Sequence, residues 1–371
     1  MLKALNVLLI GAAARKAGKT AFSCRVIRSQ AARREVVGVK ITPVHGPDEP
    51  CPRPDGGCGE CRDFPGRFRI HEERRASPAS DTGRMLLAGA RKAYWLQTRR
   101  EHLEEAMAAL WARIPAGACI VAEGNSARRA LEPGLFVLLR ERNNPEMKES
   151  FRELLPMAHR VGLFDGTEWD FPPEDCRFFD GGWMIRPLAS AVILAGGDSR
   201  RMGQDKALLE IDGRPLIAFI AGRLAEFFDE IVVGANRPAD YAFLGRPVIP
   251  DREAGLGPLM GIASCLDRIT NDLAFVTACD IPSIDLRFVA SMLEQAEGYD
   301  WVLPQAGPET YEPLFAVYRK TVVAPALAVL AGGGRRIVEL LDRVRVRRLA
   351  LPDSTRIRNI NTLDDYRALK K

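Results

Sequence analysis

The sequence predicts two α/β domains, each built on a parallel or mixed sheet with helices on both faces. Three observations predict this fold class. Short apolar segments alternate with amphipathic segments along both halves of the chain, as expected for alternating strands and helices. A glycine-rich loop follows the first apolar segment of each half, at the strand end where α/β folds bind ligands. The chain has 371 residues, which is long for one domain, so two domains are expected.

The boundary between the domains is expected in Asp180–Pro187, a stretch that contains glycine and proline just before a new apolar strand. It gives a first domain of residues 1–185, with a cysteine-rich loop at 51–61, and a second domain of residues 186–371. The amphipathic segments that are expected to form helices are Met85–Lys92, Glu101–Arg113, Leu216–Phe228 and Leu286–Ala296.

Composition and charge indicate an ordinary globular protein of the cytoplasm. The net charge is +5 and 47% of the residues are hydrophobic, so a nucleic acid is not a required partner. No apolar run reaches the roughly 18 residues that span a membrane. The apolar start, Leu5–Ala14, leads into a basic loop without a plausible cleavage site and is interpreted as a strand rather than a signal peptide. The eight cysteines are therefore expected to be reduced or metal-bound rather than paired.

The first domain carries a nucleotide-binding motif. Its first strand, Leu5–Ile10, is followed by a loop that ends in Gly18, Lys19 and Thr20. At the start of a helix these residues place backbone N–H groups, an ammonium and a hydroxyl where phosphates and Mg²⁺ bind. The usual first glycine of this P-loop falls at position 13, which is an alanine, so Gly11 is the available glycine. The alanine leaves open whether the nucleotide is hydrolysed, and the alternative is a loop that folds but binds nothing.

Two further segments of the first domain carry carboxylates. The apolar segment Cys119–Glu123 is predicted to be a strand, and Glu123 at its end would lie near the metal and water beside a nucleotide. Asp81–Thr82 is either a magnesium contact or the N-cap of a helix that begins near Gly83, and the cap is favoured.

The cysteine-rich loop is a candidate metal site. Cys58 and Cys61 have the two-residue gap with which two thiolates bind one metal ion, and Cys51 is a third candidate ligand. His45 or His71 would complete a zinc site, whereas an iron–sulfur cluster would normally need a fourth cysteine. Three free thiols or a redox-active pair are the alternatives. The remaining cysteines are interpreted as small buried residues in apolar segments or, for the last one, as a loop residue: Cys24, Cys119, Cys265, Cys279 and Cys176.

The second domain carries a different phosphate-binding pattern. A buried strand, Ala191–Leu194, runs into the glycine pair Gly196–Gly197. Glycines at a strand exit let backbone N–H groups approach phosphate oxygens. Arg200, Arg201 and Lys206 supply the positive charge that a triphosphate requires. No Gly-Lys-Ser/Thr closes this loop, so a nucleotide would be held differently from one in a P-loop.

The segment LAGGDSRRMGQDKALLEIDGRPL, residues 194–216, resembles the signature of nucleotidyltransferases that load nucleotides onto phosphorylated acceptors. Among these it is most similar to the molybdenum cofactor guanylyltransferases. Those enzymes join GMP from GTP to the terminal phosphate of Mo-molybdopterin and release pyrophosphate. Later segments repeat the resemblance in the expected order: Ile231–Arg237, Pro250–Asp251, Gly255–Leu259, Ala274–Pro282 and Asn359–Thr362. The resemblance implies a Rossmann-like mixed sheet of the glycosyltransferase-A type.

The resemblance also implies roles for single residues. The catalytic group would be Arg201, Lys206 and Asp280. The GTP-binding group would be Leu194, Ala195, Gly196, Gly197, Lys206, Asn236, Asp251 and Asp280, and the pterin side would be Asn359 and Asn361. Asp280 would hold Mg²⁺, which takes one or two carboxylates and bridges phosphate oxygens. The acceptor phosphate would attack the α-phosphorus of GTP, a reaction that needs positioning and charge neutralisation rather than a covalent nucleophile.

The first half resembles the P-loop protein that partners the guanylyltransferase in molybdopterin guanine dinucleotide synthesis. The resemblance covers about residues 1–165, and only its P-loop and Glu-Gly segment are specific. It implies a GTP-binding accessory domain, often a homodimer, that assists delivery of the cofactor to a molybdoenzyme apoprotein or its chaperone.

Two alternatives remain open. The first is cytidylyl transfer to the same pterin, or nucleotidyl transfer to another phosphorylated acceptor such as a sugar phosphate. The pair Gly196–Gly197 favours guanine, because relatives specific for CTP tend to have Ala-Gly there. The second alternative is a chain that acts mainly as a carrier or regulatory GTPase, in which the cysteine-rich loop docks a partner.

Overall fold

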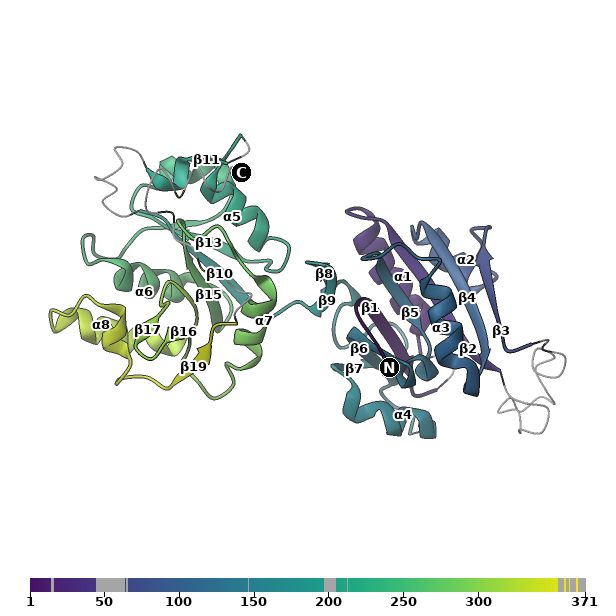
Figure 1. The fold of residues 1–371 in the computed structure, drawn as a ribbon. Coiled ribbons are helices and arrows are strands. Elements are labelled where there is room, and N and C mark those ends of the chain that lie inside the picture. Colours follow the sequence, from purple (N-terminus) through teal and green to yellow (C-terminus); the bar gives the residue numbers. More distant parts are fainter. Residues whose placement is uncertain are drawn as a thin grey trace. The chain divides into compact units, whose positions relative to one another are not determined.

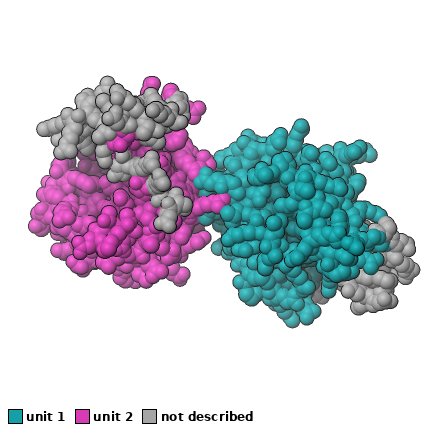
Figure 2. Space-filling model, viewed as in Figure 1, with its two compact units in different colours: residues 1–186 teal, residues 187–371 magenta. Residues whose placement is uncertain are grey.

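The computed structural model describes residues 1–14, 17–44, 64, 66–145, 147–196, 205–211, 213–352, 357, 360 and 365. The chain divides into two compact units, Met1–Arg186 (unit 1) and Pro187–Lys371 (unit 2), which Figure 2 shows in different colours. Both units combine helices with a sheet, so the predicted α/β class is confirmed (Figure 1).

Among its described residues, unit 1 contains a seven-stranded sheet in the order β3-β4-β2-β5-β1-β6-β7. All neighbours in this sheet are parallel except β3, which runs antiparallel to β4. The strands are β1 (Leu2–Ala12), β2 (Val36–Val44), β3 (Phe68–Glu73), β4 (Lys92–Arg99), β5 (Cys119–Glu123), β6 (Leu131–Glu141) and β7 (Arg160–Phe164). The helices are α1 (Lys19–Ala31), α2 (Asp81–Leu87), α3 (Leu103–Trp111) and α4 (Glu149–Leu154).

Helices cover both faces of this sheet, and successive residues of the inner strand β1 point to opposite faces. Leu8 and Ile10 of β1 pack in a core cluster with side chains of α1 and α2. Val7 and Leu9 pack in a second cluster with side chains of α3 and α4. All four side chains are fully buried, as expected for a central strand of a parallel sheet.

A two-stranded hairpin, β8 (Cys176–Phe179) and β9 (Gly182–Ile185), closes unit 1. The turn between them uses left-handed backbone at Asp180 (φ 49°) and Gly181 (φ 68°). Trp183 anchors the hairpin, since its Nε1 donates to the carbonyl oxygen of Asn6 at 3.1 Å. The prediction that Cys176 lies in a loop is wrong, because this residue begins β8 and is fully buried.

The predicted helix Met85–Lys92 is displaced along the chain. The observed helix α2 ends at Leu87, and Lys92 already belongs to β4, which pairs with β2. The predicted cap at Asp81–Thr82 is also wrong, because the N-cap is Ser80, whose Oγ accepts a hydrogen bond from the Gly83 N–H at 3.0 Å.

Unit 2 contains, in its described part, an eight-stranded mixed sheet in the order β14-β13-β10-β15-β18-β16-β17, with β19 on β16. The strands are β10 (Ala189–Leu194), β13 (Ile231–Gly234), β14 (Val248–Ile249), β15 (Leu273–Ala278), β16 (Trp301–Gly307), β17 (Thr310–Tyr311), β18 (Phe315–Arg319) and β19 (Val346–Ala350). A separate small hairpin consists of β11 (Glu210–Ile211) and β12 (Arg214–Pro215). The helices are α5 (Leu216–Leu224), α6 (Pro258–Arg268), α7 (Leu286–Glu294) and α8 (Val323–Ala331).

The site-bearing strands of unit 2 lie at the centre of its sheet. Strand β10 is parallel to β13 on one side and to β15 on the other. Helices α6 and α8 pack against one face of the sheet in a core cluster with Val192 and Val276. Because β10, β13 and β15 are parallel, their carboxyl ends lie at the same edge of the sheet.

Within the described ranges, no helix of the chain is long and apolar enough to cross a membrane.

Candidate functional site

The backbone fixes three strand ends of unit 2 beside one another. The Ala195 N–H donates to the carbonyl oxygen of Gly234 at 2.8 Å, and the Cys279 N–H donates to that of Leu194 at 3.0 Å. Gly196 follows with left-handed backbone (φ 107°), which a residue with a side chain rarely adopts. The sequence prediction placed a phosphate-facing backbone here.

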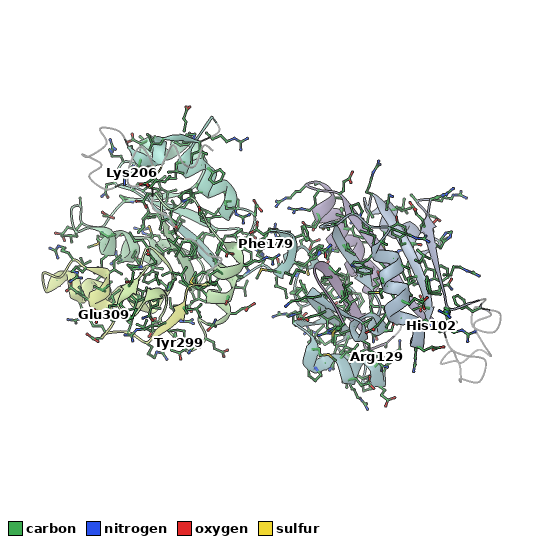
Figure 3. The ribbon with its side chains drawn as sticks, viewed as in Figure 1. His102, Arg129, Phe179, Lys206, Tyr299 and Glu309 are labelled. Atoms are coloured by element: carbon green, nitrogen blue, oxygen red, sulfur yellow. The ribbon has the colours of Figure 1, made fainter. Side chains whose placement is uncertain are left out.

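Lys206 and Asp280 meet at this edge. The Lys206 Nζ lies 3.7 Å from the Asp280 Oδ2, and both side chains are about one-fifth exposed (21% and 23%). Figure 3 labels Lys206 on unit 2. Burial raises the pKa of Asp280, whereas the Lys206 ammonium opposes this shift. The pair brings together the lysine and the carboxylate that the sequence assigned to the triphosphate and to magnesium.

Asn236 and Asp251 form a second pair at the same edge. The Asn236 Nδ2 donates to the Asp251 Oδ2 at 2.8 Å, and the Asp251 N–H donates to the Asn236 Oδ1 at 2.8 Å. Asn236 follows β13 after Ala235, and the Ala235 N–H donates to the carbonyl oxygen of Ile249 in β14 at 3.0 Å. The reciprocal bonds orient both side chains, which the sequence assigned to the base and the ribose.

Asp205, which the sequence analysis did not single out, organises the residues around Lys206. Its carboxylate accepts hydrogen bonds from the Ala207 N–H at 3.0 Å and from the Tyr241 hydroxyl at 2.7 Å. Tyr241 lies far along the chain in a short 3₁₀ segment, Pro238–Leu244, and no local motif marks it. Sequence reasoning missed it because the contact depends on tertiary structure.

The remaining predicted residues of unit 2 lie outside the described residues: Gly197, Arg200, Arg201, Asn359 and Asn361. One neighbour of the asparagine pair is described. Ile360 is buried, and its N–H donates to the carbonyl oxygen of Asp280 at 2.8 Å. Ile360, which stands between the two asparagines in the sequence, therefore lies beside Asp280.

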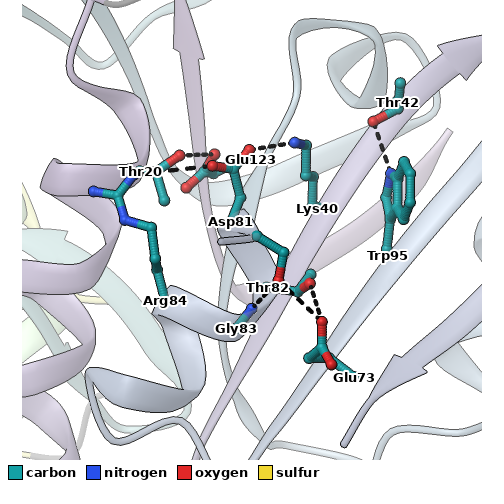
Figure 4. Close-up of polar contacts among 11 residues, drawn as sticks. Thr20, Lys40, Thr42, Glu73, Asp81, Thr82, Gly83, Arg84, Trp95 and Glu123 are labelled. Carbon is teal, nitrogen blue, oxygen red and sulfur yellow. Dashed lines mark hydrogen bonds and ion pairs between the residues drawn. The ribbon is translucent and has the colours of Figure 1, made fainter. Parts of the chain in front are cut away.

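Unit 1 holds a second polar cluster, drawn in Figure 4. The Thr20 hydroxyl at the start of α1 donates to the Glu123 Oε2 at 3.1 Å. Lys40 of β2 forms an ion pair with Asp81 at the start of α2. Glu123 is only 3% exposed, and its other oxygen, Oε1, has no hydrogen-bond partner among the described atoms. A buried carboxylate oxygen without a donor is energetically costly.

Burial and neighbouring charges shift the pKa values of Lys19, Asp81 and Glu123 in this cluster. Burial raises the pKa of Glu123, and the neighbouring Asp81 adds to the rise. Burial would also raise the pKa of Asp81, but the hydrogen bond and charge of Lys40 hold it below the ordinary value. Burial lowers the pKa of Lys19, although both carboxylates oppose this shift. The cluster thus joins two lysines and two carboxylates at the carboxyl edge of the unit 1 sheet.

The two glycines assigned to the P-loop occupy different environments. Gly18 has left-handed backbone (φ 76°) and precedes α1, as the motif requires. Gly11 lies inside β1, where an added Cβ would come within 2.6 Å of Leu138 and 2.9 Å of the Asn125 Oδ1. Close packing therefore accounts for Gly11, and its part in holding phosphate stays a prediction. Ala13 is buried just after β1.

The candidate metal ligands Cys51, Cys58, Cys61 and His45 lie outside the described residues, and His71 is an exposed residue of β3. The part of the chain that the structure describes contains no group of three or more His, Cys, Asp or Glu side chains placed to hold a metal ion. The described cysteines are free thiols: Cys24, Cys119, Cys176, Cys265 and Cys279.

Known proteins resemble unit 2. A family model described as the MobA-like NTP transferase domain matches residues 191–346. A probable molybdenum cofactor guanylyltransferase of Pelotomaculum thermopropionicum is 40% identical over 158 residues, which are 43% of this chain and 77% of that protein. One of Peptoclostridium acidaminophilum is 35% identical over 207 residues, covering 52% of this chain and 91% of its own length. The solved structure of molybdopterin-guanine dinucleotide biosynthesis protein A from Archaeoglobus fulgidus is 23% identical with a TM-score of 0.43, over 49% of this chain and 96% of that one.

Proposed function

The chain belongs to the molybdenum cofactor guanylyltransferases, and from this premise we propose that unit 2 transfers GMP from GTP to the terminal phosphate of Mo-molybdopterin. The products are molybdopterin guanine dinucleotide and pyrophosphate. The proposal depends mainly on the ion pair at the carboxyl edge of the unit 2 sheet, in which the Lys206 Nζ lies 3.7 Å from the Asp280 Oδ2. An ammonium and a carboxylate at one strand edge suit the binding of a triphosphate with its metal ion.

In the proposed mechanism the protein positions two phosphates and neutralises charge. The backbone at Ala195 and Gly196 faces the phosphates, since no side chain of Gly196 stands in the way. Lys206, together with Arg201, holds the leaving pyrophosphate. The Asn236–Asp251 pair orients the base and the ribose, so that the α-phosphorus stays in line with the acceptor.

The magnesium ion implied by the family would be held by Asp280. Its carboxylate is the ligand type that Mg²⁺ prefers, and Lys206 beside it favours the ionised form that binds a metal ion. When bound, the ion would neutralise phosphate charge and act as a Lewis acid. Asn359 and Asn361 flank Ile360, whose N–H reaches the Asp280 carbonyl, so the pterin would bind on that side.

The transfer assay tests this proposal. The full chain is incubated with Mg²⁺, Mo-molybdopterin and either GTP or CTP, and the dinucleotide and pyrophosphate are quantified. Product with GTP alone supports guanylyl transfer. Product with CTP alone favours the cytidylyl alternative, and no product with either nucleotide directs the search to other phosphorylated acceptors such as sugar phosphates.

The variant Asp280→Ala provides the residue-level test. We expect transfer to fall by at least about 100-fold, because a charged group at the reacting phosphates is removed. The exposed Glu297, outside the site, provides the matched control, and Glu297→Ala should leave the rate unchanged. Near-normal transfer by Asp280→Ala would contradict the assignment.

For unit 1 we propose a second nucleotide site, in which an accessory domain binds GTP at Lys19 and Thr20. Support comes from the helix start after Gly18 and from the Glu123 Oε1, which has no hydrogen-bond partner among the described residues. Thr20, Glu123 and Asp81 offer a hydroxyl and two carboxylates, a donor set that fits Mg²⁺. The carrier or regulatory GTPase alternative would make this site the main one.

A further inference from the structure

The residue before Lys206 is held by a side chain from a distant part of unit 2. Asp205 accepts the Tyr241 hydroxyl at 2.7 Å and the Ala207 N–H at 3.0 Å. The Arg237 Nη2 lies 3.6 Å from the same carboxylate. The backbone on both sides of Lys206 is thus tied to one carboxylate, and Ala207 is fully buried.

Tyr241 suits the role of a permanent hydrogen-bond donor. Its side chain is only 2% exposed. Burial raises the pKa of Tyr241 well above its ordinary value, and the Asp205 carboxylate adds to the rise. Both effects favour the protonated phenol, which is the form that donates to Asp205.

The same segment carries a nucleotide contact. Asn236, which pairs with Asp251, and Tyr241 lie within six consecutive residues at the carboxyl end of β13. One end of this segment holds the asparagine proposed for the base, and the other end holds Asp205. A movement of the segment would shift both groups together.

We propose that Tyr241 and Asp205 are positioning residues that hold Lys206 against the triphosphate. The inference rests on the proposed function of unit 2 and goes beyond it, because neither side chain is assigned to substrate. Removing the Tyr241 hydroxyl frees the Asp205 carboxylate on one side. The Lys206 ammonium then samples positions away from Asp280 and from the leaving phosphates.

The test compares Tyr241→Phe with Tyr318→Phe in the full chain. Tyr318 is a matched control, because it is also fully buried in unit 2 and its hydroxyl donates to the carbonyl oxygen of Pro313 at 2.7 Å. The first readout is the rate at which an amine-selective reagent labels Lys206, followed by peptide mass spectrometry. We expect a several-fold faster rate in Tyr241→Phe and no change in Tyr318→Phe. An unchanged labelling rate in Tyr241→Phe overturns the inference whether or not the chain turns over GTP.

The second readout is a double-mutant cycle on GMP transfer. Tyr241→Phe should lower kcat about tenfold in the wild-type background, which corresponds to a rise of about 1.4 kcal/mol in the activation free energy. In a Lys206→Ala background the same change should have no further effect, because there is no ammonium left to position. Equal losses in both backgrounds overturn the inference. Faster labelling in Tyr241→Phe together with no GTP-dependent transfer by the wild-type chain instead refutes the proposed function and leaves the positioning of Lys206 standing.

Discussion

At the scale of single residues, two aspartates of unit 2 show how their surroundings set the charge. Burial raises the pKa of Asp280, whereas the charge and hydrogen bond of Lys206 and a backbone hydrogen bond oppose this shift. Asp300 is the opposite case. It accepts hydrogen bonds from the Arg345 Nε at 3.0 Å and the Thr321 hydroxyl at 2.6 Å, and these bonds, from Arg345 above all, lower its pKa well below the ordinary value. The first aspartate suits ligand binding, and the second suits stability.

The variant Asp300→Asn should remove a pH-dependent part of the stability. A carboxyl group whose pKa is lowered by folding stabilises the folded chain above its unfolded pKa of about 4, and this contribution is lost as the pH falls below that value. We expect the variant to be less stable by about 1–2 kcal/mol at pH 7 and the difference to shrink by pH 3. Hydrogen exchange of β16 during urea denaturation measures this in the full chain. A difference that stays constant between the two pH values would contradict the prediction.

At the scale of elements, the ends of the strands could be predicted from the sequence, whereas the bounds of helix α2 were missed. The apolar runs before Gly196 and Asp280 are long enough to mark their strands, and the glycines and carboxylates after them mark the strand ends. The helix expected at Met85–Lys92 ends earlier, because Lys92 pairs with Val37 of β2. Such pairing is invisible in the local pattern. Gly89, with φ 104°, was an available signal for the helix end.

The contacts between elements were beyond prediction for the same reason. Asp205 and Tyr241 are hydrogen-bonded although they are 36 residues apart in the sequence, and the bonded pair Lys40 and Asp81 is 41 residues apart. Neither pair belongs to a motif, and each depends on how a helix or 3₁₀ segment returns to its sheet. The sequence therefore could not indicate either contact.

Two glycines of unit 2 should respond in opposite ways to an added methyl group. Gly222 lies exposed inside α5, where a Cβ would meet nothing within 4 Å. Gly222→Ala should therefore stabilise the chain by about 0.5–1 kcal/mol. Gly234 ends β13, and its Cβ would come within 2.8 Å of the Cys265 sulfur and the Leu194 side chain. Gly234→Ala should destabilise it by about 1–3 kcal/mol.

Urea denaturation of the full chain, with hydrogen exchange of β13 as the readout, measures both changes. Shifts of the same sign in Gly222→Ala and Gly234→Ala would contradict the open surroundings of Gly222 or the close packing of Gly234.

At the scale of the whole molecule, the chain carries two sheets with separate cores and a lysine–carboxylate cluster at the carboxyl edge of each. In unit 2 the cluster is Lys206 with Asp280, and in unit 1 it includes Lys40 with Asp81 beside Thr20 and Glu123. We predict that the two clusters act independently of each other.

Independent clusters predict a crossed pattern of losses in the full chain. Lys19→Ala should abolish nucleotide binding by unit 1, because the ammonium at the phosphates is lost, and should change basal GMP transfer less than about twofold. Asp280→Ala should abolish transfer and leave nucleotide binding at unit 1 intact. The stoichiometry of a fluorescent GTP analogue at equilibrium, which should fall from two to one per chain in Lys19→Ala, and pyrophosphate release measure the two activities side by side. If Lys19→Ala also stopped transfer, GMP transfer by unit 2 would depend on nucleotide binding by unit 1. If it removed a GTP hydrolysis that exceeds transfer in the wild type, the GTPase alternative would replace the accessory role, since the larger flux would then pass through unit 1.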